Sequence, residues 1–132
     1  MYKALPSPTP DSAPFWAGCA LHELRYQRCH DCGHVQPLPR SLCLHCHGSA
    51  LEWARASGRG RILSFTVVHR APTPAWREDV PYVIAIIDLD EGFRLMVNVA
   101  GGPQDGLAIE APVVIGFVER DGVSLPEARL LR

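Results

Sequence analysis

Two identical pairs of cysteines constrain this sequence more than any other feature. Cys29 and Cys32 form the first pair, Cys43 and Cys46 form the second, and ten residues separate the pairs. Each C-x-x-C turn offers two thiolates to two corners of a tetrahedron around a soft divalent ion, so two turns complete a four-sulfur set. Zn²⁺ is the usual occupant, and iron in the same cage is the less favoured alternative. The spacing therefore predicts a structural zinc ribbon that holds one ion.

Other roles for the cysteines fit the sequence less well. Redox-active C-x-x-C pairs usually lie where a strand meets a helix, whereas glycine and proline punctuate the chain here. A catalytic zinc site keeps an open position for water, which four thiolates do not leave. Disulfides are typical of secreted proteins, but residues 1–14 are rich in proline and lack the apolar stretch of a signal peptide, so we expect a cytoplasmic protein. The unpaired Cys19 is expected to be a buried apolar side chain rather than a nucleophile.

The composition favours a small protein with many turns. The 132 residues include 12 prolines and 11 glycines, which argues against a helical bundle. No apolar run approaches the roughly 20 residues that cross a bilayer. The formal net charge is −1, but residues 20–61 carry a balance of +3 and residues 62–132 a balance of −4. An anionic partner should therefore bind the ribbon half or the junction between the halves.

The apolar periodicity divides the chain into three parts. We expect a flexible arm over residues 1–13, a helix plus the zinc ribbon over residues 14–57, and a second domain over residues 58–132. The helix should begin near Pro14 with Asp11 or Ser12 as its cap. The ribbon strands are expected at residues 24–28, 35–38 and 50–54, and the strands of the second domain at residues 62–69, 83–89, 93–99, 113–119 and 123–125.

Five short strands without a long helix are typical of a small barrel. The fold class expected for the chain is mostly β, with a short N-terminal helix, a rubredoxin-like zinc ribbon and a C-terminal five-stranded OB-fold barrel.

Several further motifs follow one another in a characteristic order. Phe15-Trp16 precedes the first cysteine turn, and Leu51-Glu52-Trp53 follows the second. Gly58-Arg59-Gly60-Arg61, a Pro81-Tyr82 entry into an apolar strand and an Asp90-Glu91-Gly92 turn come next. This order, which extends over about residues 14–129, resembles the rubredoxin-like zinc ribbon plus OB-fold proteins associated with acyl-CoA metabolism, long catalogued as a domain of unknown function.

The resemblance implies a function that residue chemistry alone does not. Members of that family are small partners of thiolase-fold enzymes, which include thiolases, hydroxymethylglutaryl-CoA synthases, lipid-transfer-protein-like aldolases and some acyltransferases. The thiolase-like chain carries the nucleophile and base, and the small subunit shapes or covers the acyl-CoA site. The resemblance therefore implies a non-catalytic accessory subunit. In agreement, the sequence holds no G-x-S-x-G, H-E-x-x-H or Walker motif.

A zinc ribbon followed by an OB fold also occurs in proteins that bind single-stranded nucleic acid, which is the alternative hypothesis. Such a surface needs a basic groove and exposed aromatic platforms. The barrel half is acidic instead, the sequence pI is about 6.6, and Phe65 and Phe93 lie among apolar neighbours. The charge pattern therefore disfavours nucleic acid.

Candidate contacts to a partner or to acyl-CoA come from aromatic and arginine side chains. The loop between residues 69 and 82 carries two arginines, a tryptophan and a tyrosine, which are good interface residues; alternatively, its tryptophan packs on its own barrel. The aromatic pair of the helix either docks on the ribbon or meets the partner, and an arginine after the ribbon could meet CoA phosphates. These candidates are Phe15, Trp16, Arg59, Arg70, Trp76, Arg77 and Tyr82.

Overall fold

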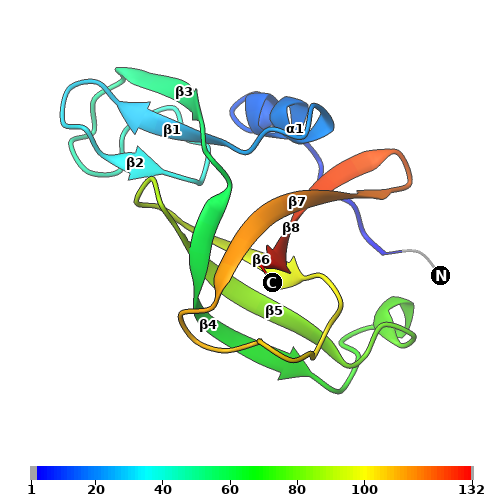
Figure 1. Cartoon of the computed structure of the whole chain (residues 1–132). Helices are drawn as coiled ribbons and strands as arrows, with labels where there is room; N and C mark the ends of the chain where they lie inside the picture. Colours follow the sequence, from blue (N-terminus) through cyan, green and yellow to red (C-terminus); the bar gives the residue numbers. More distant parts are fainter. Residues whose placement is uncertain (1–2, 132) are drawn as a thin grey trace.

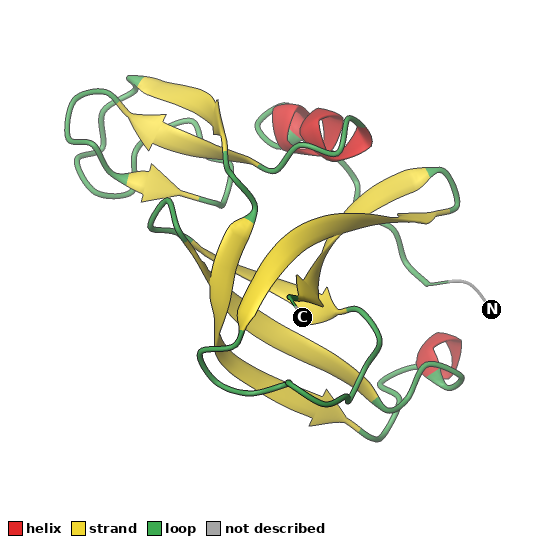
Figure 2. Cartoon of the chain, viewed as in Figure 1, coloured by secondary structure: helices red, strands yellow, loops and turns green. Residues whose placement is uncertain are grey.

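The computed structural model describes residues 3–131. The chain consists of a small three-stranded ribbon and a β-barrel (Figures 1 and 2). A helix, α1 (Ala13–Ala20), precedes both. The ribbon consists of β1 (Arg25–Cys29), β2 (Val35–Gln36) and β3 (Leu51–Arg55). The barrel contains β4 (Arg59–Val68), β5 (Tyr82–Leu89), β6 (Arg94–Val99), β7 (Pro112–Arg120) and β8 (Val123–Leu130), with a 3-10 turn, η1 (Pro74–Trp76), between β4 and β5. The mostly β fold expected from the sequence is confirmed.

The helix begins next to Pro14, with one of the two expected cap residues before it. Pro14 lies in the first turn, where its missing N–H costs nothing. Ser12 occupies the N-cap position, but its side chain makes no capping bond to the helix. Its hydroxyl instead accepts a 2.7 Å hydrogen bond from the Thr9 N–H, because the preceding turn offers a nearer donor. Phe15 and Cys19 are buried, so α1 is held by packing rather than by its cap.

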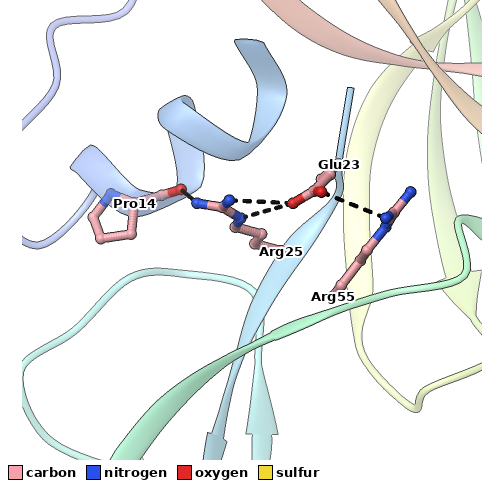
Figure 3. Close-up of polar contacts among 4 residues, drawn as sticks. All are labelled: Pro14, Glu23, Arg25 and Arg55. Carbon is pink, nitrogen blue, oxygen red and sulfur yellow. Dashed lines mark hydrogen bonds and ion pairs between the residues drawn. The ribbon is translucent and has the colours of Figure 1, made fainter. Parts of the chain in front are cut away.

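An ion-pair cluster fixes α1 to the ribbon (Figure 3). The Arg25 guanidinium donates to the Pro14 carbonyl at 3.1 Å and to the Glu23 carboxylate at 3.1 and 3.3 Å. The Arg55 guanidinium reaches the other Glu23 oxygen at 3.4 Å. Because Arg25 begins β1 and Arg55 ends β3, the cluster ties the helix to the end of the ribbon that leads into the barrel.

A pair of buried glutamines holds the loop between β2 and the second cysteine turn. The Gln36 amide donates to Gln27 Oε1 at 2.9 Å, and Gln36 Oε1 accepts from the Leu44 N–H at 3.0 Å. Gln27 in turn donates to the Arg40 carbonyl at 2.9 Å and accepts from the Arg40 N–H at 3.0 Å. Buried amides require such partners. The strand expected at 35–38 ends at Gln36. The residues that follow it form a loop that these glutamine hydrogen bonds hold in place.

The barrel strands are arranged in the order β4-β5-β6-β8-β7. Neighbours pair antiparallel except for β6 and β8, which run parallel and share the single pair Val99↔Ala128. β8 extends five residues beyond the expected end at residue 125. The expected strand was too short because Pro126 interrupts its pattern; proline is tolerated in a strand where its nitrogen faces no partner.

One hydrophobic core joins the ribbon to the barrel. The Tyr26 ring of β1 stacks on the Phe93 ring at 4.8 Å between centroids. Phe15, Cys19 and Leu24 belong to the same buried cluster as the barrel interior, which is lined by Ile62, Val83, Ala85, Ile87, Leu89, Val97, Val99, Val113, Ile115 and Ala128. Within the described residues, no helix has the length and apolar character needed to span a membrane.

Candidate metal centre and apolar groove

The four paired cysteines converge on one point. Their sulfurs all lie within 4.8 Å of one another, and two of the Sγ–Sγ distances, Cys29 to Cys46 and Cys32 to Cys43, are 3.6 Å. Four sulfurs bonded at about 2.3 Å to a tetrahedral ion would lie about 3.8 Å apart. The residues present therefore fit one tetrahedral metal ion, and the predicted ligand set forms a closed four-sulfur site.

The two cysteine turns repeat the same backbone geometry. The Gly33 N–H donates to the Cys29 carbonyl at 2.9 Å, and the His47 N–H donates to the Cys43 carbonyl at 3.0 Å. Both donors have positive φ, 76° for Gly33 and 64° for His47. A residue with positive φ is needed one position after the second cysteine of each pair, because the chain must curl back around the sulfurs there. A histidine at the second position carries strain that a glycine would not.

Backbone N–H groups favour the thiolate at one corner of the site. The N–H of Cys46, assisted by that of His45, lowers the pKa of the Cys43 thiol to about 7; the bond from the His45 N–H to the sulfur is 3.4 Å long. Metal ligation needs the deprotonated form, so these donors favour the ligand form of Cys43 near neutral pH.

The histidines near the cysteines form contacts of their own. His30 Nε2 lies 2.9 Å from Glu52 Oε2, and the His34 and His45 rings stack at 5.7 Å between centroids. Among the described residues, the ligand-type cluster consists of the four cysteines without a histidine. The imidazoles therefore lie outside the ligand set, which the four thiolates complete.

The loop before β5 packs Trp76 against its own chain. The Trp76 ring lies 5.1 Å from the Tyr82 ring, and the Arg120 guanidinium lies 5.2 Å from the Trp76 centroid. Lys3 covers the same ring at 4.9 Å and forms an ion pair with Asp79. Trp76 therefore packs on its own barrel, which is the second of the two alternatives that the sequence left open for this residue. Arg70 and Arg77 are exposed on the same loop.

The other candidate contact residues lie elsewhere. Phe15 is buried, and its ring meets that of the half-buried Trp16 edge-on at 5.0 Å. Arg59 is exposed at the start of β4, where its carbonyl accepts a 3.0 Å bond from the Asp90 N–H. No described pocket contains both Trp16 and Trp76. Their role in contacting a partner stays a prediction.

The structure contains an apolar groove that the sequence did not predict. It has a volume of about 590 Å³ and lies between α1, the segment 37–39 and the outer side of β5 and β6. Met96 and Leu38 are 70% and 57% exposed at this groove. The available signal was the alternation of β6, which points Met96 outward. Its lining is Ser12, Phe15, Trp16, Pro37, Leu38, Pro39, Ile86, Arg94, Leu95, Met96 and Pro126.

Comparison with known families matches both halves of the chain. Residues 16–52 match the model described as "ChsH2, rubredoxin-like zinc ribbon domain", and residues 53–118 match "ChsH2, C-terminal OB-fold domain". These ranges meet within β3, two residues from its start.

Individual relatives extend the similarity. A "DUF35 domain-containing scaffold protein" of Methanocaldococcus jannaschii is 36% identical over 72% of this chain and 69% of its own length. The "Benzoylsuccinyl-CoA thiolase subunit BbsA" of Thauera aromatica is 29% identical over 92% and 78%, respectively. The chain spans about a third of the length of two curated hydratase alpha subunits, from Thermomonospora curvata and Mycobacterium tuberculosis, at 34% and 37% identity.

One solved structure is similar to this chain over nearly its whole length. A chain of the structure titled "Ltp2-ChsH2(DUF35) aldolase" superposes with a TM-score of 0.83 at 32% identity. The match covers 96% of this chain and 98% of that one.

Proposed function

Because the chain belongs to the DUF35 family of ChsH2-type zinc ribbon and OB-fold proteins, we propose that it is a non-catalytic accessory subunit of an acyl-CoA-processing enzyme complex. Scaffold and subunit names among the relatives support an accessory role. The observation that carries the proposal is the likeness, over nearly the full length of both chains, to a chain of an aldolase complex.

The proposed partner is a thiolase-fold enzyme subunit whose acyl-CoA site this chain helps to shape or cover. A thiolase subunit among the relatives and the Ltp2-ChsH2 structure support this choice. The partner would supply the nucleophile and base, as the family resemblance implies. The exposed arginines of this chain, Arg59, Arg70 and Arg77, are available for phosphate or carboxylate groups at a shared interface.

Zinc is the ion proposed for the four-sulfur site. Four thiolates form the closed ligand set that is typical of structural Zn²⁺, and the family model carries the same description. When bound, the ion would supply structural rigidity, because no ligand position is left for a reacting molecule. It would hold the two cysteine turns together, and through the loop 37–44 it would fix one wall of the apolar groove.

Purification of the tagged full chain from its native host tests the proposal. We expect a thiolase-fold protein, identified by mass spectrometry, to remain bound through size-exclusion chromatography. The chain alone should not turn over acyl-CoA thioesters, whereas the complex should. Turnover by the isolated chain, or retention of no thiolase-fold protein, would contradict the proposal. Tight binding of single-stranded DNA that weakens steeply with salt would support the nucleic-acid alternative instead.

A further inference from the structure

Strand β6 is fully paired along only one of its edges. Six residue pairs, from Val83↔Val99 to Asp88↔Arg94, join one edge to β5. The other edge meets β8 at the single pair Val99↔Ala128. Within the part of the chain that the structure describes, residues 94–98 therefore have no paired residue on that side, although β8 is the next strand of the barrel. An open edge of this kind is a template for an additional strand.

The backbone of Met96 faces the open edge. The Phe93 carbonyl accepts a 2.9 Å bond from Leu89 on the β5 side, and the Ala100 N–H donates a 2.8 Å bond to Ala128 on the β8 side. Backbone polar groups in a paired strand alternate between its two edges. Residues 94, 96 and 98 therefore share the orientation of Ala100. The N–H and C=O of Met96 point away from β5, toward the opening.

The facing edge of β8 is less able to accept a strand. Ala128 directs its backbone toward β6, and Pro126 lies two residues earlier on the same edge. Proline has no N–H, so β8 offers no donor at this position. Of the two edges that border the opening, β6 is the one that can form a regular ladder.

The apolar groove lies along this edge. Leu95, Met96 and Pro126 line it together with Phe15 and Trp16 of α1. Alternate side chains of an added strand would enter such a groove, which gives backbone pairing its specificity. Because α1 and the segment 37–39 wall the groove, a second copy would present an equally recessed edge. Two recessed edges cannot meet, so self-pairing is disfavoured.

The charge of the groove defines the chemistry of its occupant. Arg94 is the charged residue of its lining. No ion pair joins Arg94 to a carboxylate among residues 3–131, although Asp88 is its cross-strand neighbour. An apolar segment with an acidic residue would pair with this guanidinium.

We propose that an extended segment of the thiolase-fold partner adds to the barrel as a strand along the β6 edge. Its alternate apolar side chains fill the groove, and one of its acidic residues pairs with Arg94. This inference rests on the proposed function, since it names the contact through which that partner is held.

A comparison of two variants at position 96 tests backbone pairing independently of side-chain packing. Met96→Pro removes the N–H that faces the opening and leaves the pairs with β5 unchanged, whereas Met96→Ala keeps the N–H and removes the side chain. The probe is the thiolase-fold protein recovered with the wild-type chain and then purified. We expect Met96→Pro to weaken its binding at least about tenfold relative to Met96→Ala, which corresponds to the loss of one hydrogen bond or more. Equal affinity of the two variants would overturn strand addition.

Hydrogen exchange provides a measurement that does not depend on a variant. The Met96 amide should exchange rapidly in the free chain and become protected in the complex, while amides of β5 stay protected in both. Arg94→Glu should weaken binding, and Arg61→Glu, whose side chain lies outside the groove, should not. If the wild type holds a thiolase-fold partner but the Met96 amide stays unprotected, the strand inference fails while the proposed function stands. If no such partner binds, both fail. Protection that depends on the concentration of the isolated chain would assign the edge to a second copy and overturn the choice of partner.

Discussion

At the level of single residues, the pKa of the thiol, rather than burial, separates Cys19 from Cys43 of the metal site. Cys19 is 0% exposed within the core, and its burial raises the pKa of its thiol to about 11. Cys43 is nearly as buried, but backbone N–H groups lower its pKa to about 7. Because the thiolate is the metal ligand, Cys43 is better suited to bind an ion near neutral pH than Cys19 is.

Cys19 should resist alkylation in the folded protein. At pH 8 its raised pKa and burial leave almost no accessible thiolate. We expect iodoacetamide to label Cys19 only after denaturation, as measured by peptide mass spectrometry. Stability should also fall as the pH rises from about 9 toward about 11, because over that range the unfolded state loses the Cys19 proton first. Cys19→Ala should remove this part of the pH dependence. Rapid labelling of native protein would contradict the burial.

Two cysteines of equal burial provide a matched pair for testing the metal site. Cys43→Ala removes one of four ligands, whereas Cys19→Ala removes a buried sulfur outside the site. We expect the first variant to hold less than one ion per chain by inductively coupled plasma mass spectrometry, and the second to hold one. The second should cost only about 1 kcal/mol through its small cavity. Equal metal content would show that Cys43 is not a ligand.

Gly60 is required where β4 pairs with the end of β5. A Cβ at this position would lie 2.5 Å from the Asp88 carbonyl oxygen and 3.0 Å from Ile87 Cγ2. Gly60→Ala should therefore destabilise the chain by about 3 kcal/mol in urea unfolding, since backbone must move. Gly122→Ala is the control, because a Cβ at position 122 would meet no atom within 4 Å. The φ of Gly122 is 82°, so this variant should lose only about 1 kcal/mol of unfolding free energy through backbone strain. Similar losses would contradict the steric argument.

At the level of elements, alternation made most strands predictable. The expected and observed strands of the barrel differ by at most three residues at each end apart from β8. β8 was shortened in the expectation because Pro126 normally ends a strand, whereas here its nitrogen faces an unpaired edge. The buried amides of Gln27 and Gln36 gave no signal, because glutamine is usually exposed. The groove could not be predicted because α1, β6 and β8 come together only in the folded chain.

The Gln27–Gln36 pair should control how tightly the second cysteine turn holds the metal. Gln36→Met keeps the side-chain volume but leaves the Leu44 N–H without its acceptor. We expect the free energy of unfolding to fall by about 2 kcal/mol. The ion should also pass to a chelator faster, as measured with a chromogenic zinc indicator. Leu42→Met on the same loop is the control, because Leu42 is 49% exposed. Unchanged metal release in Gln36→Met would show that the glutamine network does not support the site.

At the scale of the whole molecule, the predicted boundary at residue 57 does not divide the core. Tyr26 of the ribbon stacks on Phe93 of the barrel, and the Ala56 N–H donates to the Leu24 carbonyl at 2.7 Å. Glu91, in the turn between β5 and β6, accepts a 2.8 Å bond from the Ser57 N–H. Exposing Tyr26 and Phe93 by separating the halves would cost apolar burial on both sides. We therefore propose that ribbon and barrel fold as one cooperative unit.

Removal of the metal should then destabilise the barrel as well as the ribbon. Trp53 lies on β3 of the ribbon, and Trp76 lies at the far loop of the barrel. Fluorescence therefore reports each part in variants that lack Trp16 and retain either Trp53 or Trp76. A ligand that binds only the native state stabilises every element that unfolds with it. We expect chelation to lower both midpoints by the same amount, and the two midpoints to coincide with and without metal. A ribbon transition that falls while the Trp76 transition stays unchanged would show two independent units, and the shared core would then contribute little to their coupling.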